Sequence, residues 1–370
     1  MGIITSGIPL ALKMFARKIK ISINGFKQYP GSAEEICEQV VKDCWNGKYF
    51  AGSAGHFSQF WLRDFCFSAE ALAYLGYEKE VRQTLDWALG VYEKHNKITT
   101  TIFENEKPVN IFSESAESLP YIINTSKRFA PDLLKKYKKF LSLKINNYYI
   151  EFIDHKTGLI RQDIDFSGMK DAFKRKSACV DNCMVAMMAS DLKKIRNLPN
   201  PFSEYDYEKL IKENFWTGKF FKDDLSGDDY LAGDANVIPF STETIKDTGT
   251  LEQCIKAIQE NELDKPFPLK YAVDYIEWKQ RTLSNVFTSN YEGDTIWMNI
   301  GVLYIAQVAK ANKQLARKYL KNYTRLIESH KNYLELFNPN GSVYKTLFYH
   351  ADEGMIWAAI YLKLKKDLNI

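Results

Sequence analysis

The segment Trp61-Leu-Arg63-Asp64-Phe-Cys-Phe-Ser-Ala-Glu-Ala-Leu-Ala-Tyr-Leu-Gly76-Tyr77 joins a charged pair to an apolar run that then breaks. The run has the spacing of an amphipathic helix, and a glycine ends it. The same succession of apolar stripe and turn recurs along the chain. Stripes at helical spacing include Val81, Leu85, Ala88, Leu89 and Tyr92; Val180, Cys183, Met184 and Met187; Leu251, Cys254, Ile255 and Ile258; and Met355, Ala358, Ala359 and Leu362. Strand-like alternation is scarce, so the sequence predicts an all-α protein of about a dozen paired helices.

The domain organisation is inferred from the turns and linkers between these helices. No Ser/Gly linker or low-complexity tract divides the chain, so we expect an N-terminal extension over residues 1–30 and a single domain over residues 31–370. A short sequence repeat, the mark of a solenoid, is missing. A toroid of helical hairpins, in which the last helix meets the first, is therefore the expected architecture. The polar segments 161–177 and 217–248 are too long for plain connectors and are expected to carry function at one end of the toroid.

Composition excludes several classes of function. The 370 residues carry a net charge of +4, and Lys and Arg are scattered, so no nucleic-acid partner is expected. Six cysteines and five histidines show neither a Cys-x-x-Cys nor a His-x-x-x-His spacing, which predicts no metal, no cofactor and no disulfide framework. Reduced thiols fit a cytoplasmic protein. The apolar N-terminus is about a dozen residues long and too short for a membrane span. No feature of the sequence sets an oligomeric state.

The opening motif has a chemical interpretation as well as a structural one. Aromatic faces such as that of Trp61 pack against the C–H surfaces of sugars, while Arg63 and Asp64 can form paired hydrogen bonds with hydroxyl groups. The alternative is a charged pair that only begins a helix. Many of the chain's aromatic residues are expected to pack between helices rather than line a carbohydrate groove.

Four segments, in order, resemble the (α/α)6 six-hairpin glycosidases, the group of glucoamylases, trehalases and glycogen-debranching enzymes. The segments are Gly55-His-Phe-Ser-Gln-Phe-Trp61-Leu-Arg63-Asp64; Ser167-Gly-Met-Lys-Asp171-Ala172, followed by Asp181-Asn182; Tyr291-Glu-Gly293-Asp-Thr-Ile-Trp297; and Glu335-Leu-Phe-Asn-Pro-Asn-Gly341, followed by Glu353-Gly-Met-Ile-Trp357. Together they extend from about residue 50 to residue 362. The resemblance implies a toroidal fold and an inverting glycoside hydrolase, in which two carboxyl groups flank the scissile bond.

Asp171 is the expected general acid. It lies beside Phe166, Met169 and Phe173, where partial desolvation would raise its pKa. Lys170 and Lys174 would oppose that shift, and a lysine directly before the aspartate departs from the family pattern. Asp163 and Asp165 are therefore alternative acids, and a helix N-cap is the structural alternative for Asp171.

Glu335 is the expected base, with Glu353 as its alternative. Glu335 precedes the Asn-Pro-Asn-Gly turn at an aromatic-rich helix end, where a carboxylate gains nothing from the helix dipole. Glu353 is close to Asp352 at the expected start of the last helix, a position that also suits a structural acid. If it is not the base, Glu353 is expected to bind substrate.

The remaining candidate residues are substrate binders. The resemblance implies that Arg63 and Asp64 bind the sugar at the non-reducing end, which favours an exo-acting enzyme. Trp61, Trp297 and Trp357 could supply stacking surfaces, and at least one of them is expected to pack in the core instead. The Gly233-Asp234-Ala-Asn236 turn could present Asp234 to the pocket. Acids nearby are expected to form a solvated loop rather than a calcium site: Asp223, Asp224, Asp228 and Asp229.

The expected activity is hydrolysis of an α-linked glucoside such as trehalose, a malto-oligosaccharide or a small glucosylated solute. A sugar epimerase or lyase on a helical toroid, and a non-catalytic carbohydrate-binding protein, are the alternatives. Epimerases and lyases generally use His or Tyr as the catalytic base. Only His56 of the five histidines lies near a motif, which argues against these two activities.

Overall fold

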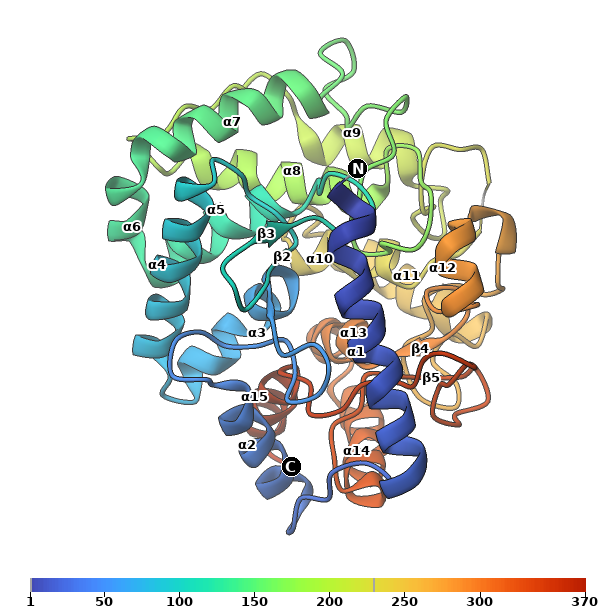
Figure 1. Cartoon of the computed structure of the whole chain (residues 1–370). Coiled ribbons are helices and arrows are strands. Elements are labelled where there is room, and N and C mark those ends of the chain that lie inside the picture. The colour runs from blue at the N-terminus through green and yellow to red at the C-terminus, as the bar shows by residue number, and fades with distance from the viewer. Residues whose placement is uncertain (1, 229) are drawn as a thin grey trace.

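The computed structural model describes residues 2–228 and 230–370 and consists mainly of helices (Figure 1). Met1, part of the predicted extension, and Asp229, part of the predicted acidic loop, lie outside the described residues. Within the described chain, six helices form an inner ring in which each packs against the next and α15 packs against α3. The inner helices are α3 (Leu62–Tyr74), α5 (Ser118–Phe129), α8 (Cys179–Leu192), α10 (Ile238–Ser241), α13 (Met298–Ala311) and α15 (Ala358–Leu368). This closed ring confirms the predicted (α/α)6 toroid.

An outer layer of helices surrounds the ring, and each outer helix precedes its inner partner in the sequence. The outer helices are α2 (Ala33–Cys44), α4 (Glu78–Lys94), α7 (Lys138–Phe152), α9 (Tyr207–Phe215), α11 (Thr248–Glu260) and α14 (Lys313–His330). Their apolar stripes face inward: α11 buries Leu251, Cys254, Ile255 and Ile258, as the sequence predicts. The inner helix α8 differs, because its neighbours bury every residue except Ser190. A single stripe on α8 is therefore a wrong prediction.

Local sequence explains where several helices begin and how closely they pack. Ser32 and Glu35 form a capping box at the start of α2, and Asp247 caps α11 by accepting from the Thr250 amide at 2.7 Å. On α13, a side chain at Gly301 would overlap the Tyr323 hydroxyl of α14. Glycine at this position allows the inner and outer helices of neighbouring hairpins to touch.

All six inner helices begin at the same end of the ring, which we call the mouth. The cap residues of α3, α5, α13 and α15 are Trp61, Glu117, Trp297 and Trp357. Two small antiparallel sheets join the loops that connect to these starts: β1 (Phe60–Trp61), β2 (Thr101–Ile102) and β3 (Pro108–Val109), and β4 (Ile296–Trp297) with β5 (Leu336–Phe337). Helix N-termini carry partial positive charge, so the mouth suits carboxylates and polar ligands.

The segment 217–248 is not one long loop. It contains the 3-10 helix η1 (Asp234–Asn236) and α10, the shortest member of the inner ring. The short helices α6 (Pro131–Lys136), α12 (Thr282–Phe287) and η2 (Glu277–Lys279) lie outside the ring.

Helix α1 (Gly2–Asn24) lies across the mouth (Figure 1). Lys13 donates to the Ser58 hydroxyl at 2.6 Å and pairs with Glu104, and Arg17 pairs with Glu353. These three partners lie in loops that lead into α3, α5 and α15. Of the helices in the described part of the chain, none has the length and apolar character needed to cross a membrane.

Candidate active site

Arg63 joins three elements at the mouth. Its Nε donates to Glu117 at 2.5 Å, and its Nη2 donates to the Gly168 carbonyl at 2.5 Å and lies 3.1 Å from Asp171 Oδ2. The Ser167 hydroxyl also donates to Asp171. The predicted sugar-binding arginine and the predicted general acid are therefore in direct contact, although 108 residues separate them.

Asp171 belongs to a group of carboxyls around this arginine. We call Arg63, Glu117, Asp171 and Glu292 the acid cluster. Glu292 accepts the amide of Ala172 at 2.6 Å. Burial, together with Asp171, raises the pKa values of Glu117 and Glu292, although Arg63 opposes the shift. Glu117 and Glu292 are buried beside a single cation, so both carboxyls retain protons near neutral pH.

The two alternative acids of the same segment occupy other positions. Asp163 forms a bidentate pair with Arg161, and its side chain is 65% exposed. Asp165 pairs with Arg281 at 2.6 Å. Neither has a contact with Arg63 in the described structure, so Asp171 is the aspartate of this segment that enters the acid cluster.

Glu335 is held in a buried, tyrosine-rich environment. Its carboxylate accepts hydrogen bonds from Tyr291, from Tyr349 at 2.6 Å and from the Asp352 amide at 2.7 Å. Its carbonyl accepts from the Met298 amide at 3.1 Å, which fixes it at the start of α13. Burial, with Asp352 nearby, raises the pKa of Glu335 to about 8, while the hydrogen bonds oppose that rise.

A chain of polar groups continues behind Glu335. The Tyr349 hydroxyl lies 3.1 Å from His56 Nε2, and His56 Nδ1 lies 3.1 Å from Asp352. Burial lowers the pKa of His56 to about 4 despite Asp352, so the imidazole is neutral at pH 7. His56 therefore supports Tyr349 from behind, and this geometry does not favour it as the base of an epimerase or lyase.

Tyr291 and Glu292 connect the two candidate catalytic groups. The Tyr291 hydroxyl donates to Glu335, and the next residue, Glu292, accepts the amide that follows Asp171. Trp297 fixes this connection, because its Nε1 donates to the Tyr291 carbonyl at 2.8 Å. The loop before α13 thus contacts both the acid cluster and the base candidate.

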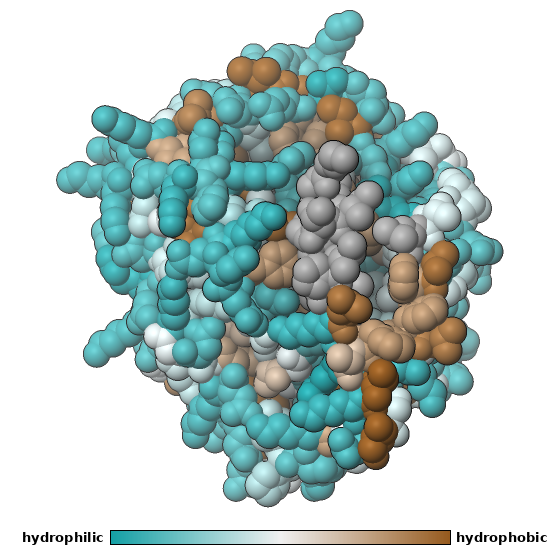
Figure 2. Space-filling model, in the orientation of Figure 1, coloured by the Kyte–Doolittle hydropathy of each residue, from teal (hydrophilic) through white to brown (hydrophobic). Residues whose placement is uncertain are grey.

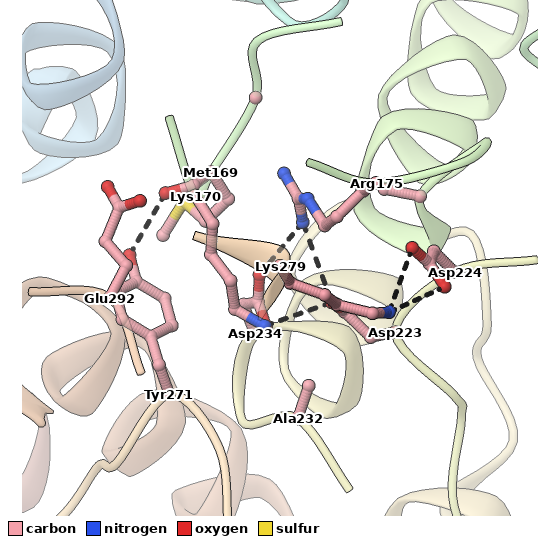
Figure 3. A network of polar contacts seen from close by, with 12 residues as sticks. Met169, Lys170, Arg175, Asp223, Asp224, Ala232, Asp234, Tyr271, Lys279 and Glu292 are labelled. Carbon is pink, nitrogen blue, oxygen red and sulfur yellow. Dashed lines mark hydrogen bonds and ion pairs between the residues drawn. The ribbon is translucent and has the colours of Figure 1, made fainter. Parts of the chain in front are cut away.

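Lys170 does not approach Asp171. Its ammonium lies 3.0 Å from both Asp223 and Asp234, and Arg175 pairs with the same two carboxylates at 3.6 and 3.4 Å (Figure 3). Burial opposes ionisation of Asp223, but Lys170 and Arg175 outweigh it and lower its pKa. The lysine that departs from the family pattern therefore belongs to a structural ion network.

This network corrects two expectations from the sequence. Asp223 and Asp224 are completely buried rather than solvated, and Lys279 lies 3.2 Å from Asp224. Asp234 is also completely buried, with its carboxylate engaged by two cations. Buried charges are stable only when paired in this way.

The tryptophans at the mouth differ in exposure. Trp297 and Trp357 are buried, with ring centroids 6.4 Å apart, whereas Trp61 is half-buried against Phe57. The half-buried Asp64 lies near Trp357; burial raises its pKa to about 6, although Arg63 opposes this. Trp61 and Asp64 therefore keep more exposed surface than the other two rings.

Glu353 is occupied by the N-terminal segment. Besides Arg17, it accepts from the Lys27 amide at 2.6 Å and from Asn332 Nδ2 at 3.0 Å. The side chain is buried, and its carboxylate anchors α1 through Arg17.

Sequence reasoning missed several members of the site. Glu117 carries no motif, and only its contact with Arg63 reveals it. Tyr291 and Glu292 belong to the family-like segment that ends at Trp297, but no function was predicted for either residue. Tyr349 belongs to no recognisable motif. Asp181, at the start of α8, lies against Gly168, and burial raises its pKa to about 7.

A cavity of about 1290 Å³ opens at the other end of the ring, among the C-terminal halves of the inner helices. None of the predicted site residues lines it. The mouth remains the better candidate, because the paired carboxyls and the shifted pKa values are there.

Comparison with known proteins supports the fold. No protein-family model matches the sequence, and no curated protein matches it. A solved glycosidase in complex with glucose superposes with a TM-score of 0.69 and 11% identity, over 91% of this chain and 97% of the other. The rhamnosidase from Klebsiella oxytoca with rhamnose bound gives 0.65 and 9%, over 93% and 66%. The GH63 mannosylglycerate hydrolase from Thermus thermophilus, with Tris and D-glycerate, gives 0.59 and 11%, over 90% and 100%. The chain therefore has the (α/α)6 fold of the six-hairpin glycosidases.

Proposed function

We propose that this protein is an inverting, exo-acting glycoside hydrolase that cleaves an α-linked glucoside, with Asp171 as general acid and Glu335 as general base. One observation carries the proposal: the Tyr291-Glu292 pair contacts Glu335 on one side and the segment of Asp171 on the other. One loop that contacts Glu335 and the residue after Asp171 suits a reaction that needs an acid and a base at a fixed separation.

In the proposed reaction Asp171 donates a proton to the leaving glycosidic oxygen, while Glu335 accepts a proton from the attacking water. Water attacks the anomeric carbon from the face opposite the leaving group, so the configuration inverts. Glu117 and Glu292, which burial keeps protonated near neutral pH, are the proposed source of the proton that Asp171 donates. The hydroxyls of Tyr291 and Tyr349 stabilise Glu335 in its ionised form.

Residues at the start of α3 are the proposed binders of the non-reducing sugar. Asp64 and Trp61 are half-buried, and Arg63 holds the acid cluster together. A solved neighbour binds glucose and another is a mannosylglycerate hydrolase, which supports a small glycoside as substrate. The buried rings of Trp297 and Trp357 would support these binders from within the fold. Asp234 and Glu353 act as positioning residues, because cations and backbone amides occupy them.

The test is a screen of the purified protein against trehalose, malto-oligosaccharides and small α-glucosides, with NMR of the anomeric proton during turnover. Release of the inverted sugar supports the proposal. Asp171→Asn and Glu335→Gln should each lower kcat by about 1000-fold or more. Asp163→Asn, in the same segment but exposed, is the matched control and should keep nearly full activity.

Three outcomes would overturn the assignment. Full activity in Asp171→Asn or Glu335→Gln excludes that residue. A product that has gained no water indicates an epimerase or lyase. Saccharide binding by calorimetry, without turnover at any pH, indicates a carbohydrate-binding protein.

A further inference from the structure

Helix α1 carries an apolar stripe that faces solvent. Leu12, Phe15, Ile19 and Ile23 are 63%, 39%, 44% and 75% exposed. Their spacing of three or four residues places them on one side of the helix. An exposed stripe over three turns exceeds the scattered apolar residues of an ordinary surface.

The stripe continues onto neighbouring loops. The ring of Phe15 lies 6.2 Å from Phe348, which lies 5.3 Å from Phe287 of α12. Leu347 and Val286, next to these rings in sequence, are 72% and 63% exposed. Figure 2 shows apolar side chains gathered over the lower half of α1 and the adjacent α12 region. We call the stripe together with Val286, Phe287 and Leu347 the apolar face.

Charge distinguishes α1 from the rest of the chain. It holds four of the 50 basic residues and none of the 46 acidic ones, so the other 46 basic residues balance the acids. Lys13 and Arg17 point toward the mouth of the ring, where they pair with Glu104 and Glu353. At 100° per residue, Lys18 and Lys20 flank the stripe, one on each side.

We propose that α1 docks this protein on the surface of an anionic lipid bilayer. The apolar face would enter the boundary between head groups and acyl chains, and Lys18 and Lys20 would meet the anionic head groups. The helix would lie in the plane of the membrane rather than cross it. This inference depends on α1 and its neighbours and is independent of the proposed hydrolase activity.

A second copy of the chain fits the apolar face less well. A two-fold contact through the stripe would bring Lys18 and Lys20 of one copy against the same residues of the other. With no acidic residue on α1 to compensate, this contact places like charges together.

Co-sedimentation with vesicles tests the proposal on the full chain. The protein should partition about tenfold more strongly onto phosphatidylcholine vesicles that contain about 30% phosphatidylserine than onto vesicles of phosphatidylcholine alone. Raising the salt to about 0.5 M should weaken binding. Leu12→Glu/Ile19→Glu should lower binding about tenfold or more, and Lys18→Glu/Lys20→Glu should remove the preference for anionic vesicles.

The matched control is Leu143→Glu/Ile150→Glu on α7. These residues are also seven positions apart on one helix and are 47% and 63% exposed. This variant should bind vesicles like the unmodified protein, and circular dichroism checks that all variants are folded. The proposal is wrong if the unmodified protein does not bind vesicles, or if the α7 variant loses as much binding as the α1 variant. A dimer that Leu12→Glu/Ile19→Glu disperses would also overturn it, in favour of self-association.

Discussion

The hydroxyl of Tyr349 lies 2.6 Å from the carboxylate of Glu335, in a buried site where burial and Asp352 raise the pKa of Glu335 to about 8. A hydrogen bond to the ionised carboxylate lowers this pKa, so Tyr349 limits the rise. The proposed base is therefore ionised only toward the alkaline side of neutrality, and turnover should increase with pH up to about 8.

Tyr349→Phe should move the acidic limb of the pH profile of kcat/KM upward by about one unit, because the ionised carboxylate loses a donor. The matched control is Tyr344→Phe, whose hydroxyl donates instead to the Ser289 carbonyl at 2.7 Å. Its acidic limb should not move. An unchanged limb in Tyr349→Phe would contradict the assignment of Glu335 as base.

Glu292→Gln should shift the basic limb of the same profile to lower pH. The pKa of Glu292 is raised to about 8, so the change removes a negative charge that would develop beside Asp171 only in the alkaline range, and it keeps an oxygen that can accept the Ala172 amide. With less like charge nearby, the acid cluster releases its proton more easily. Glu277→Gln, on an exposed turn, should leave the limb in place. An upward shift in Glu292→Gln would be inconsistent with the cluster as a shared proton store.

The free energy of unfolding should fall as the pH rises from about 5 to 8. The pKa values of Glu335, Asp181 and Asp64 are raised to about 8, 7 and 6 by burial, whereas unfolded Asp and Glu titrate near pH 4. In this window the folded protein holds protons that unfolding releases, so a higher pH favours unfolding.

Glu335→Gln should flatten this dependence. The amide never ionises, so the variant should exceed the unmodified protein in unfolding free energy at pH 8.5 by on the order of 2 kcal/mol, while it loses activity. Thermal or urea unfolding at pH 5.5 and 8.5 measures the difference. Equal pH slopes in the two proteins would show that Glu335 titrates normally.

Lys170→Met should destabilise the fold by about 3–5 kcal/mol, because it leaves Asp223 and Asp234 buried with one cation fewer. Lys174→Met, four residues along the same segment but exposed, should change the free energy of unfolding by about 0.5 kcal/mol or less. Adding Asp234→Asn to Lys170→Met should recover part of the loss. Denaturant unfolding measures all three variants. If Lys170→Met leaves the free energy of unfolding unchanged, the network adds nothing to stability.

The helical hairpins were predictable because outer helices such as α11 and α14 bury one stripe and expose the opposite face. Periodicity fails for α8, whose burial on all sides comes from neighbours far away in the sequence. The 3-10 helix at Asp234 and the four-residue α10 are too short to leave a periodic signal.

The candidate site was predictable only where a motif marked it. Arg63 and Asp171 stand in recognisable segments, but the contact between them, and the entry of Glu117, depend on the closed ring. Asp223 and Asp234 resemble a solvated acidic loop in sequence. Their cationic partners, Lys170 and Arg175, lie about 50 to 60 residues away, and only the fold brings them together.

The contact of α15 with α3 has a consequence for how the protein is made. Every inner helix except α15 packs mainly on neighbours synthesised just before or after it, whereas α15 joins the two ends of the ring. Until residues 358–368 leave the ribosome, the growing chain can form only an open arc in which α3 lacks its packing against α15. The mouth is thus completed only when α15, with its cap residue Trp357, packs against α3. The open arc that precedes this step is the stage at which the chain is most prone to aggregation.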